Sequence, residues 1–302
     1  MHPPLDAFFH PAPDGGRRLY LHHTPPRGTP LRGGVLYLHP WAEEMNKSRR
    51  MAALASRALA ADGWAVLQVD LLGCGDSSGD FADASWQAWT DDAVHAAAWL
   101  HDWLQPRAPA APLWLWGLRA GALLACSAAP RLTMPLNLLF WQPVQQGKAA
   151  LQQFLRLKAA AQLADGGGKA ILDAARADLA AGRTVEVAGY ALAPALAHGL
   201  EQAMLTPPPA VPPGGRLVWL ETSTAAEPAA SPAVQAALPR WQAAGWAADL
   251  RITPGPAFWQ TTEIEDAPAL VEATVAALGG TAGAGDHATT GPANHRPVAV
   301  GP

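Results

Sequence analysis

The feature that most constrains the fold is a regular alternation along the chain. Short runs of aliphatic, aromatic and β-branched residues alternate with longer runs whose apolar residues recur at helical spacing. Neighbouring parallel strands need a crossover connection, usually a helix, so this alternation predicts a mostly parallel sheet with helices on both faces. The predicted strands are 17–23, 34–38, 64–70, 113–116, 136–142, 216–221 and 248–252, and the predicted helices are about 46–61, 85–104, 232–245 and a closing helix after residue 265. Ser85 is predicted to cap the second of these helices.

The composition favours a folded chain and excludes two classes of partner. Of the 302 residues, half are hydrophobic and 15% are charged, which is enough apolar material for one domain over residues 1–278. The net charge of −4 comes without a long basic run, so we expect no nucleic-acid partner. The longest apolar stretch, residues 113–129, contains Arg119 and is shorter than a membrane-spanning helix. We therefore predict no membrane insertion, and the sequence indicates no oligomeric state.

Two segments depart from the alternation. Between Gln145 and about Pro213 the chain carries helical runs and the breaker TPPPAVPP, which predicts an inserted helical cap at about 145–213. Residues 279–302 have almost no large apolar side chain, which predicts a disordered tail. The chain has only two cysteines, and its first residues lack the charged and apolar regions of a secretory leader. Both observations favour the cytoplasm.

The sequence predicts no metal and no cofactor. It contains no H-x-x-x-H or C-x-x-C pattern, and Glu43 with Glu44 is not a ligand set. The glycine-rich turn GCGDSSG lacks the lysine of a phosphate-binding loop and has the wrong spacing for a dinucleotide loop.

The turn at residues 117–121, Gly-Leu-Arg-Ala-Gly, lies between a predicted strand and an apolar helix. It resembles the nucleophile elbow G-x-S-x-G of α/β-hydrolases, in which a strained turn presents the nucleophile at a helix N-terminus. Arg119 stands in the place of the nucleophile. A guanidinium stays protonated and has no lone pair to attack a carbonyl, so this turn cannot serve a serine-hydrolase mechanism.

A more specific resemblance covers residues from about 5 to 278. The segments VLYLHPWAEEMNKSRRMAA, AVLQVDLLGCGDSSGDF, LWLWGLRAGALLA and PGPAFWQTTEIED resemble the exosortase A system-associated hydrolase 2 family. These proteins are encoded beside exosortase/PEP-CTERM and exopolysaccharide genes in Gram-negative bacteria. The resemblance implies an α/β-hydrolase fold, with a mostly parallel central sheet, flanking helices and a helical cap insertion. It also implies a cytoplasmic accessory role, and it supplies no established substrate.

The superfamily's site can be placed on this chain residue by residue. The resemblance implies that residues 39–41, which include His39, form the oxyanion loop, with the backbone N–H groups of Trp41 and Ala120 as donors. It places Glu221 at the position of the triad acid. The segment after the last strand, residues 254–260, contains Trp259 but no histidine. The general base of the triad is therefore missing as well as the nucleophile.

The sequence is compatible with two roles for Arg119. A cation at a helix N-terminus suits an anionic ligand such as a carboxylate or phosphate. A buried arginine also commonly pairs with an internal carboxylate, and Glu43 and Glu44 are expected at the same edge of the sheet.

The turn at residues 70–79 is expected to border the same pocket. It contributes Asp76 as a pocket residue and Cys74 as the candidate for a substitute nucleophile.

Two classes of function therefore remain. One is a hydrolase of the exosortase A system with a degenerate triad, acting on a small anionic or acyl ligand, for which ordinary Ser-His-Asp esterase activity is not expected. The other is a non-catalytic pseudo-hydrolase that binds an anionic ligand or a partner protein. On the residues alone, binding is favoured over triad hydrolysis.

Overall fold

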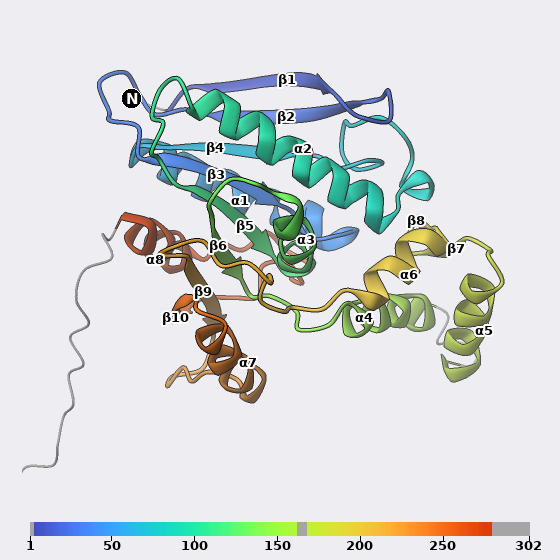
Figure 1. The fold of residues 1–302 in the computed structure, drawn as a ribbon. Helices are drawn as coiled ribbons and strands as arrows, with labels where there is room; N and C mark the ends of the chain where they lie inside the picture. Colours follow the sequence, from blue (N-terminus) through green and yellow to red (C-terminus); the bar gives the residue numbers. More distant parts are fainter. Residues whose placement is uncertain (1–2, 162–167, 280–302) are drawn as a thin grey trace, which may run out of the picture.

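The computed structural model describes residues 3–161 and 168–279 (Figure 1). Its centre is an eight-stranded sheet in the order β1-β2-β4-β3-β5-β6-β9-β10. Strands β4, β3, β5, β6, β9 and β10 run parallel, whereas β1 pairs antiparallel with β2, and β2 antiparallel with β4. The chain is therefore an α/β protein with a mostly parallel sheet, as the alternation predicts. The sheet strands are β1 (Leu5–Pro11), β2 (Arg17–His23), β3 (Gly33–Leu38), β4 (Trp64–Val69), β5 (Leu113–Leu118), β6 (Leu136–Trp141), β9 (Arg216–Ser223) and β10 (Ala247–Pro254).

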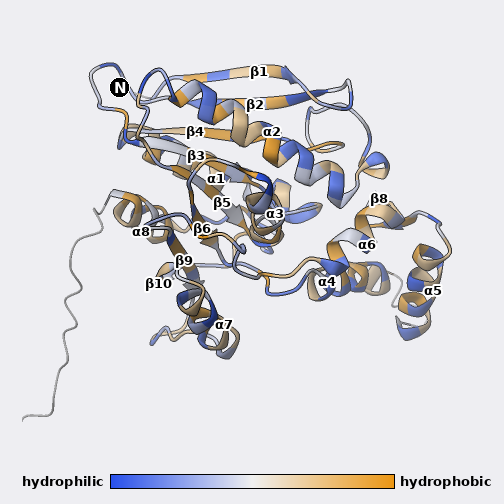
Figure 2. Cartoon of the chain, viewed as in Figure 1, coloured by the Kyte–Doolittle hydropathy of each residue, from blue (hydrophilic) through white to orange (hydrophobic). Residues whose placement is uncertain are grey.

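The helices cover both faces of this sheet. Side chains that alternate along the strands separate into two buried clusters, one packed against α2, α3 and α7 and the other against α1 and α8. In Figure 2, hydrophilic residues alternate with hydrophobic ones along α2, as expected for a helix with one buried side. The helices on the sheet are α1 (Glu43–Ala61), α2 (Trp86–Leu104), α3 (Ala120–Ala128), α7 (Pro232–Ala243) and α8 (Pro268–Gly279).

All seven predicted strands lie in this sheet, whereas one strand was missed and one helix boundary needs correction. Strand β1 was not predicted, because it is an edge strand with mostly exposed side chains and shows little apolar periodicity. Helix α1 begins at Glu43 and not at Asn46. Glu43 and Glu44 occupy its first turn, where negative charge is favourable beside the helix dipole. The predicted cap at Ser85 is confirmed, since its side chain accepts a hydrogen bond from the N–H of Ala88.

The segment from 145 to 213, predicted as a cap, contains three helices and a small hairpin among its described residues, 145–161 and 168–213. Its two connections to the sheet are joined, because Gly147 donates a backbone hydrogen bond to Ala203 and Leu205 donates one to Gln145. The segment therefore enters and leaves the sheet domain at one place. Its elements are α4 (Gly147–Ala161), α5 (Gly168–Ala180), β7 (Val185–Val187), β8 (Tyr190–Leu192) and α6 (Pro194–Gln202).

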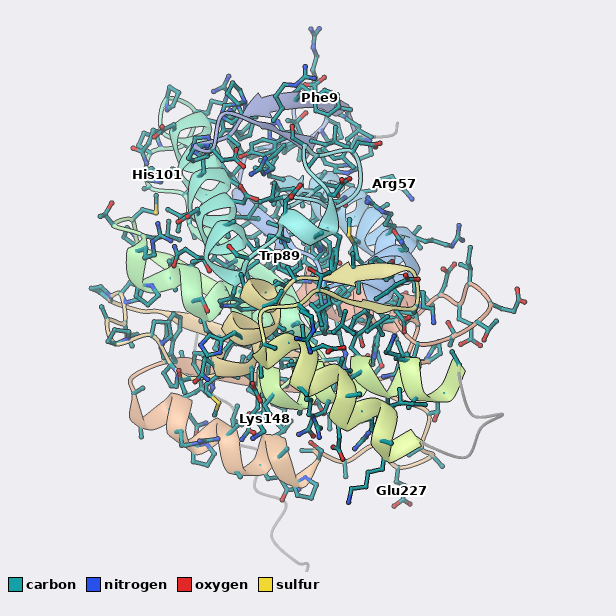
Figure 3. The ribbon with its side chains drawn as sticks, turned by 90° about the vertical axis from the view of Figure 1, so that its right-hand side faces the viewer. Phe9, Arg57, Trp89, His101, Lys148 and Glu227 are labelled. Carbon is teal, nitrogen blue, oxygen red and sulfur yellow. The ribbon has the colours of Figure 1, made fainter. Side chains whose placement is uncertain are left out.

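Figure 3 views the molecule from the side of this segment. Phe9 on β1 and Glu227 after β9 lie at opposite ends of the molecule, in agreement with the strand order.

Of the predicted tail, Gly279 still belongs to α8, and residues 280–302 lie outside the described residues. In the part of the chain that the structure describes, no helix has the length and apolarity to cross a membrane.

Two adjacent histidines of β2 are buried in the sheet domain. Burial lowers the pKa of His22 and of His23 to about 4. The Nε2 atom of His22 and the Nδ1 atom of His23 have no hydrogen-bond partner among the described residues. The folded state therefore keeps both rings neutral at a pH where the unfolded chain protonates them.

We expect the free energy of unfolding to fall as the pH drops from about 6.5 towards 4, because only the unfolded state gains the protons. Replacing His22→Leu should reduce the loss between pH 7 and pH 5 by about 1–2 kcal/mol. Urea unfolding at both pH values measures this, and exposed His198→Leu is the control. An unchanged pH dependence in His22→Leu would contradict the assignment.

Candidate functional site

The centre of the candidate site is the turn between β5 and α3. Arg119 has φ 54° and ψ −118°, a sparsely populated conformation for a residue with a Cβ. A Cβ on Gly117 would overlap the backbone of Ala122, and a Cβ on Gly121 would overlap the carbonyl oxygen of Leu38. The two glycines thus let α3 lie directly against β3 and β5, and the chain between them is held in the strained geometry of an elbow.

Residues with a strained backbone conformation cluster at this edge of the sheet. Of the four non-glycine residues with positive φ in the described ranges, three follow strands β3, β5 and β6: Ala42, Arg119 and Gln142. Because these strands are parallel neighbours, the three turns are adjacent at the carboxyl end of the sheet. Strained residues that cluster in this way are typical of functional sites.

The Arg119 guanidinium is enclosed by acceptors, all at long distances. Its Nε donates to Glu44 Oε1 at 3.3 Å, its Nη1 to the Gln142 carbonyl at 3.4 Å and its Nη2 to Gln153 Oε1 at 3.5 Å. The guanidinium carbon lies 5.3 Å from the ring centre of Trp259. The side chains of Arg119 and Glu44 are only 12% and 14% exposed. The internal ion pair therefore forms, with Glu44 as the partner.

A second buried arginine shows what a well-satisfied pair looks like in the same protein. Arg18 Nε donates to both carboxylate oxygens of Asp92 at 2.9 and 2.8 Å, and its Nη2 donates to Asp14 at 2.6 Å. Charge-assisted hydrogen bonds normally fall in that shorter range. By comparison, none of the hydrogen bonds of Arg119 is short, so its positive charge is only weakly compensated by these three acceptors.

A small cavity of about 40 Å³ adjoins the guanidinium. One water occupies about 10–15 Å³ on this measure, so the cavity holds roughly three water-sized groups. The sheet edge supplies the polar part of its wall, and the chain leading into α4 supplies a mostly apolar part. The lining residues are Trp41, Glu43, Glu44, Arg119 and Ala120 on one side and Val144, Ala150, Gln153, Phe154 and Leu157 on the other.

Both residues predicted as oxyanion donors line this cavity. The backbone N–H groups of Trp41 and Ala120 donate to no protein acceptor within residues 3–161 and 168–279. The ring of Trp41 packs against Phe154, with ring centres 4.5 Å apart. Two backbone donors and one cation are thus available around a space that excludes most water.

His39 belongs to the neighbouring structure and does not line the cavity. Its Nε2 accepts from the N–H of Leu71 at 3.3 Å, so the ring proton lies on Nδ1, which donates to the carbonyl of Pro40 at 2.6 Å. Burial also lowers the pKa of His39. With both nitrogens engaged, His39 holds the β3 and β4 ends together and is not free to accept a proton from a substrate.

The structure places three further predicted residues away from the cavity. Cys74 is buried, and burial raises the pKa of its thiol well above the usual range, so it gains no support as a nucleophile. Asp76 is exposed, and its N–H donates to Asp70. Glu221 lies within β9, where it accepts from Trp219 Nε1 at 3.2 Å, and burial raises its pKa.

Several residues that contact Arg119 or line the cavity were not among the sequence-based candidates. Gln142 directly follows β6 at the same sheet edge as Arg119, and this position is a signal that could have found it. The α4 residues 150, 153, 154 and 157 share one helix face by their spacing, yet which face turns towards the sheet depends on the packing of the inserted segment.

The elbow geometry predicts that glycine is required at position 121. Replacing Gly121→Ala should lower the free energy of unfolding by about 2 kcal/mol or more, because the new methyl group meets backbone that cannot move aside. The control is Gly168→Ala, where the added Cβ meets nothing closer than 4.0 Å. Chemical denaturation of both variants measures the difference, and equal stabilities would refute the close approach of α3 to β3.

The ion pair predicts a second stability effect. Arg119→Ala removes the counterion of the largely buried Glu44 and should cost about 2–3 kcal/mol at pH 8. Arg50→Ala is the control, since Arg50 forms a bidentate pair with Asp266 on the surface and such pairs contribute less than about 1 kcal/mol. If the two variants lose the same stability, Glu44 does not depend on Arg119.

Comparisons with solved structures show the same fold. Est1E from Butyrivibrio proteoclasticus, solved with ferulic acid, aligns with a TM-score of 0.58 at 14% identity over 90% of this chain and 96% of its own. A monoglyceride lipase from Saccharomyces cerevisiae aligns at 0.56 and 14% identity over 92% and 93%. A serine hydrolase without a lid from Xanthomonas campestris aligns at 0.50 and 17% identity over 91% and 92%.

The family follows from the sequence profile. No curated protein sequence matches this chain. The profile of the X-Pro dipeptidyl-peptidase (S15) family matches residues 14–286, which is most of the chain and includes every strand of the sheet except β1. The protein therefore has an α/β-hydrolase fold and belongs to the X-Pro dipeptidyl-peptidase (S15) family.

Proposed function

We propose that this protein is a non-catalytic member of its fold that binds a small oxyanion, a carboxylate or a phosphate, at Arg119. The observation that carries the proposal is that the Arg119 guanidinium has only long hydrogen bonds. It is largely buried beside a cavity, and its three acceptors lie at 3.3–3.5 Å. An anion in the cavity would give it the short charge-assisted hydrogen bonds that the protein itself does not provide.

The surroundings support an anion in that position. Arg119 precedes the first turn of α3, where the helix dipole favours negative charge. The N–H groups of Trp41 and Ala120 have no protein acceptor in the described ranges. A cation and two backbone donors around one small cavity make an anion-binding arrangement.

The same residues support the proposal that the catalytic triad is degenerate. The elbow carries a guanidinium, the segment after β10 carries Trp259 in place of a histidine, and His39 has both ring nitrogens in structural hydrogen bonds. Within the described part of the chain, no serine, cysteine or histidine lines the cavity. In this proposal the chain has neither the peptidase activity named for its family nor the esterase and lipase activities of its structural neighbours.

We further propose that the chain belongs to the exosortase A system-associated hydrolase 2 group and acts in the cytoplasm as an accessory protein. The four sequence segments that resemble that group include the elbow, the oxyanion loop and the segment around Trp259. In this proposal residues 145–213 act as a cap, supported by the contribution of α4 to the cavity wall.

The binding proposal predicts that phosphate or a short carboxylate binds the wild-type protein and that Arg119→Gln reduces the affinity at least tenfold. The loss follows from removing the one cation in the cavity wall. Isothermal titration calorimetry measures the affinities, and Arg50→Gln, a change at an exposed surface pair, is the matched control. If Arg119→Gln binds as tightly as Arg50→Gln, the site is elsewhere.

A pseudo-hydrolase should also resist active-site reagents. We expect no labelling by a fluorophosphonate probe and no turnover of p-nitrophenyl esters above that of buffer, because no activated hydroxyl or thiol faces the cavity. Stoichiometric labelling of the pure protein would identify a nucleophile and overturn the non-catalytic assignment.

A further inference from the structure

The ion pair at the elbow also defines which anion fits and what happens when it binds. We infer that the ligand is a monocarboxylate with a short aliphatic chain, which takes the place of Glu44 on Arg119 while Glu44 takes up a proton. This inference rests on the proposed binding function and adds the ligand class and the linked proton.

The size and lining of the cavity favour a small carboxylate. A volume of about 40 Å³ accommodates about three water-sized groups, which matches a carboxylate group with little more than a short alkyl stub. The lining also includes Val144, Ala150 and Phe154. These side chains offer apolar contacts to an alkyl chain and no donors to further oxygens.

The charges around Arg119 favour a monoanion. Glu44 is its ion-pair partner, Glu43 lines the same cavity, and Lys47 follows on the same helix. From β9, the buried carboxyl group of Glu221 also interacts electrostatically with Arg119. From α4, the group that reaches Arg119 is the neutral side chain of Gln153. A phosphate dianion would bring two negative charges into surroundings that already hold three glutamates, Glu43, Glu44 and Glu221. A carboxylate that replaces a carboxylate leaves the charge of the cavity unchanged, provided that Glu44 becomes neutral.

The geometry requires that the Glu44 carboxylate become protonated when the ligand binds. Arg119 Nε is the group that Glu44 contacts at 3.3 Å, and the Glu44 side chain is only 14% exposed. When a ligand occupies Arg119, an ionised Glu44 would be left largely buried without its counterion, which is costly. Burial already raises the pKa of Glu44 despite the neighbouring guanidinium. Losing that partner raises the pKa further, so protonation accompanies the exchange.

The exchange balances in atoms and charge. Before binding, the ionised Glu44 is paired with the Arg119 guanidinium, and the ligand is an ionised carboxylate in solution. Afterwards, the ligand carboxylate is paired with the guanidinium, and Glu44 holds one proton from the solvent. No covalent bond other than the O–H bond of the Glu44 carboxyl is formed. Binding therefore consumes close to one proton at a pH above the pKa of Glu44.

The test is calorimetric titration of the wild-type protein with propionate at pH 7 in two buffers of different ionisation enthalpy. The difference in observed enthalpy gives the number of protons taken up, and we expect a value near one. The dissociation constant should rise towards tenfold per unit of pH between pH 6 and 8, since each binding event needs a proton. Propionate itself stays ionised throughout this range, so the proton is assigned to the protein.

Two variants locate the proton. Glu44→Gln should abolish the proton uptake and the pH dependence and should bind propionate at least as tightly as the wild type at pH 8. Glu43→Gln should retain most of the uptake, because Glu43 has no hydrogen bond to Arg119. Uptake that persists in Glu44→Gln would overturn the inference.

The remaining outcomes separate this inference from the proposed function. Binding of propionate at Arg119 without proton uptake would refute the exchange and leave the anion site intact. Tighter binding of inorganic phosphate than of propionate would refute the ligand class. If neither anion binds the wild-type protein, the proposed function itself fails.

Discussion

The close approach of α3 to the sheet is the constraint on which the rest of the site depends. Gly117 and Gly121 leave no room for a Cβ against the backbone of the elbow and of β3. Of the three residues between these glycines, Arg119 is the one that adopts a positive φ. In hydrolases the strained backbone of the elbow presents a nucleophile, and in this protein the same backbone geometry presents the guanidinium of Arg119.

A cation in that position determines the character of the cavity around it. Glu44 reaches Arg119 because α1 begins at Glu43, directly after the loop that follows β3. The inserted segment then encloses the pair through α4, with Gln153 on the guanidinium and Phe154 on Trp41. The result is a cavity of about 40 Å³ that carries donors for an anion. Two of its walls, the elbow and the α1 start, are formed by turns with positive φ.

The protein thus shares its fold with esterases and lipases while its elbow carries a different chemical group. Likeness in fold extends over about nine-tenths of the chain at 14–17% identity, and it says little about what happens at one side chain. Arg18 and Arg119 illustrate the same lesson inside the molecule. Both are buried arginines paired with acids, yet short bidentate contacts indicate a structural role for Arg18, and long contacts beside a cavity leave Arg119 able to change partners.

Much of the fold followed from the sequence, because parallel strands with helical crossovers impose a strong alternation that local composition carries. Seven strands, the Ser85 cap and the elbow were predictable in this way, whereas β1 was not, since an exposed edge strand has no buried side to create a pattern. The sequence by itself determined that an arginine stands at the centre of the elbow and that residues 254–260, directly after the last strand, contain no histidine. Only the tertiary structure decided that Glu44 and not Glu43 pairs with Arg119, that Gln142 and Gln153 complete the contacts, and that Cys74 and Asp76 lie outside the cavity. These choices depend on helix rotation and on the packing of residues more than 20 positions apart, and no local pattern encodes such distances.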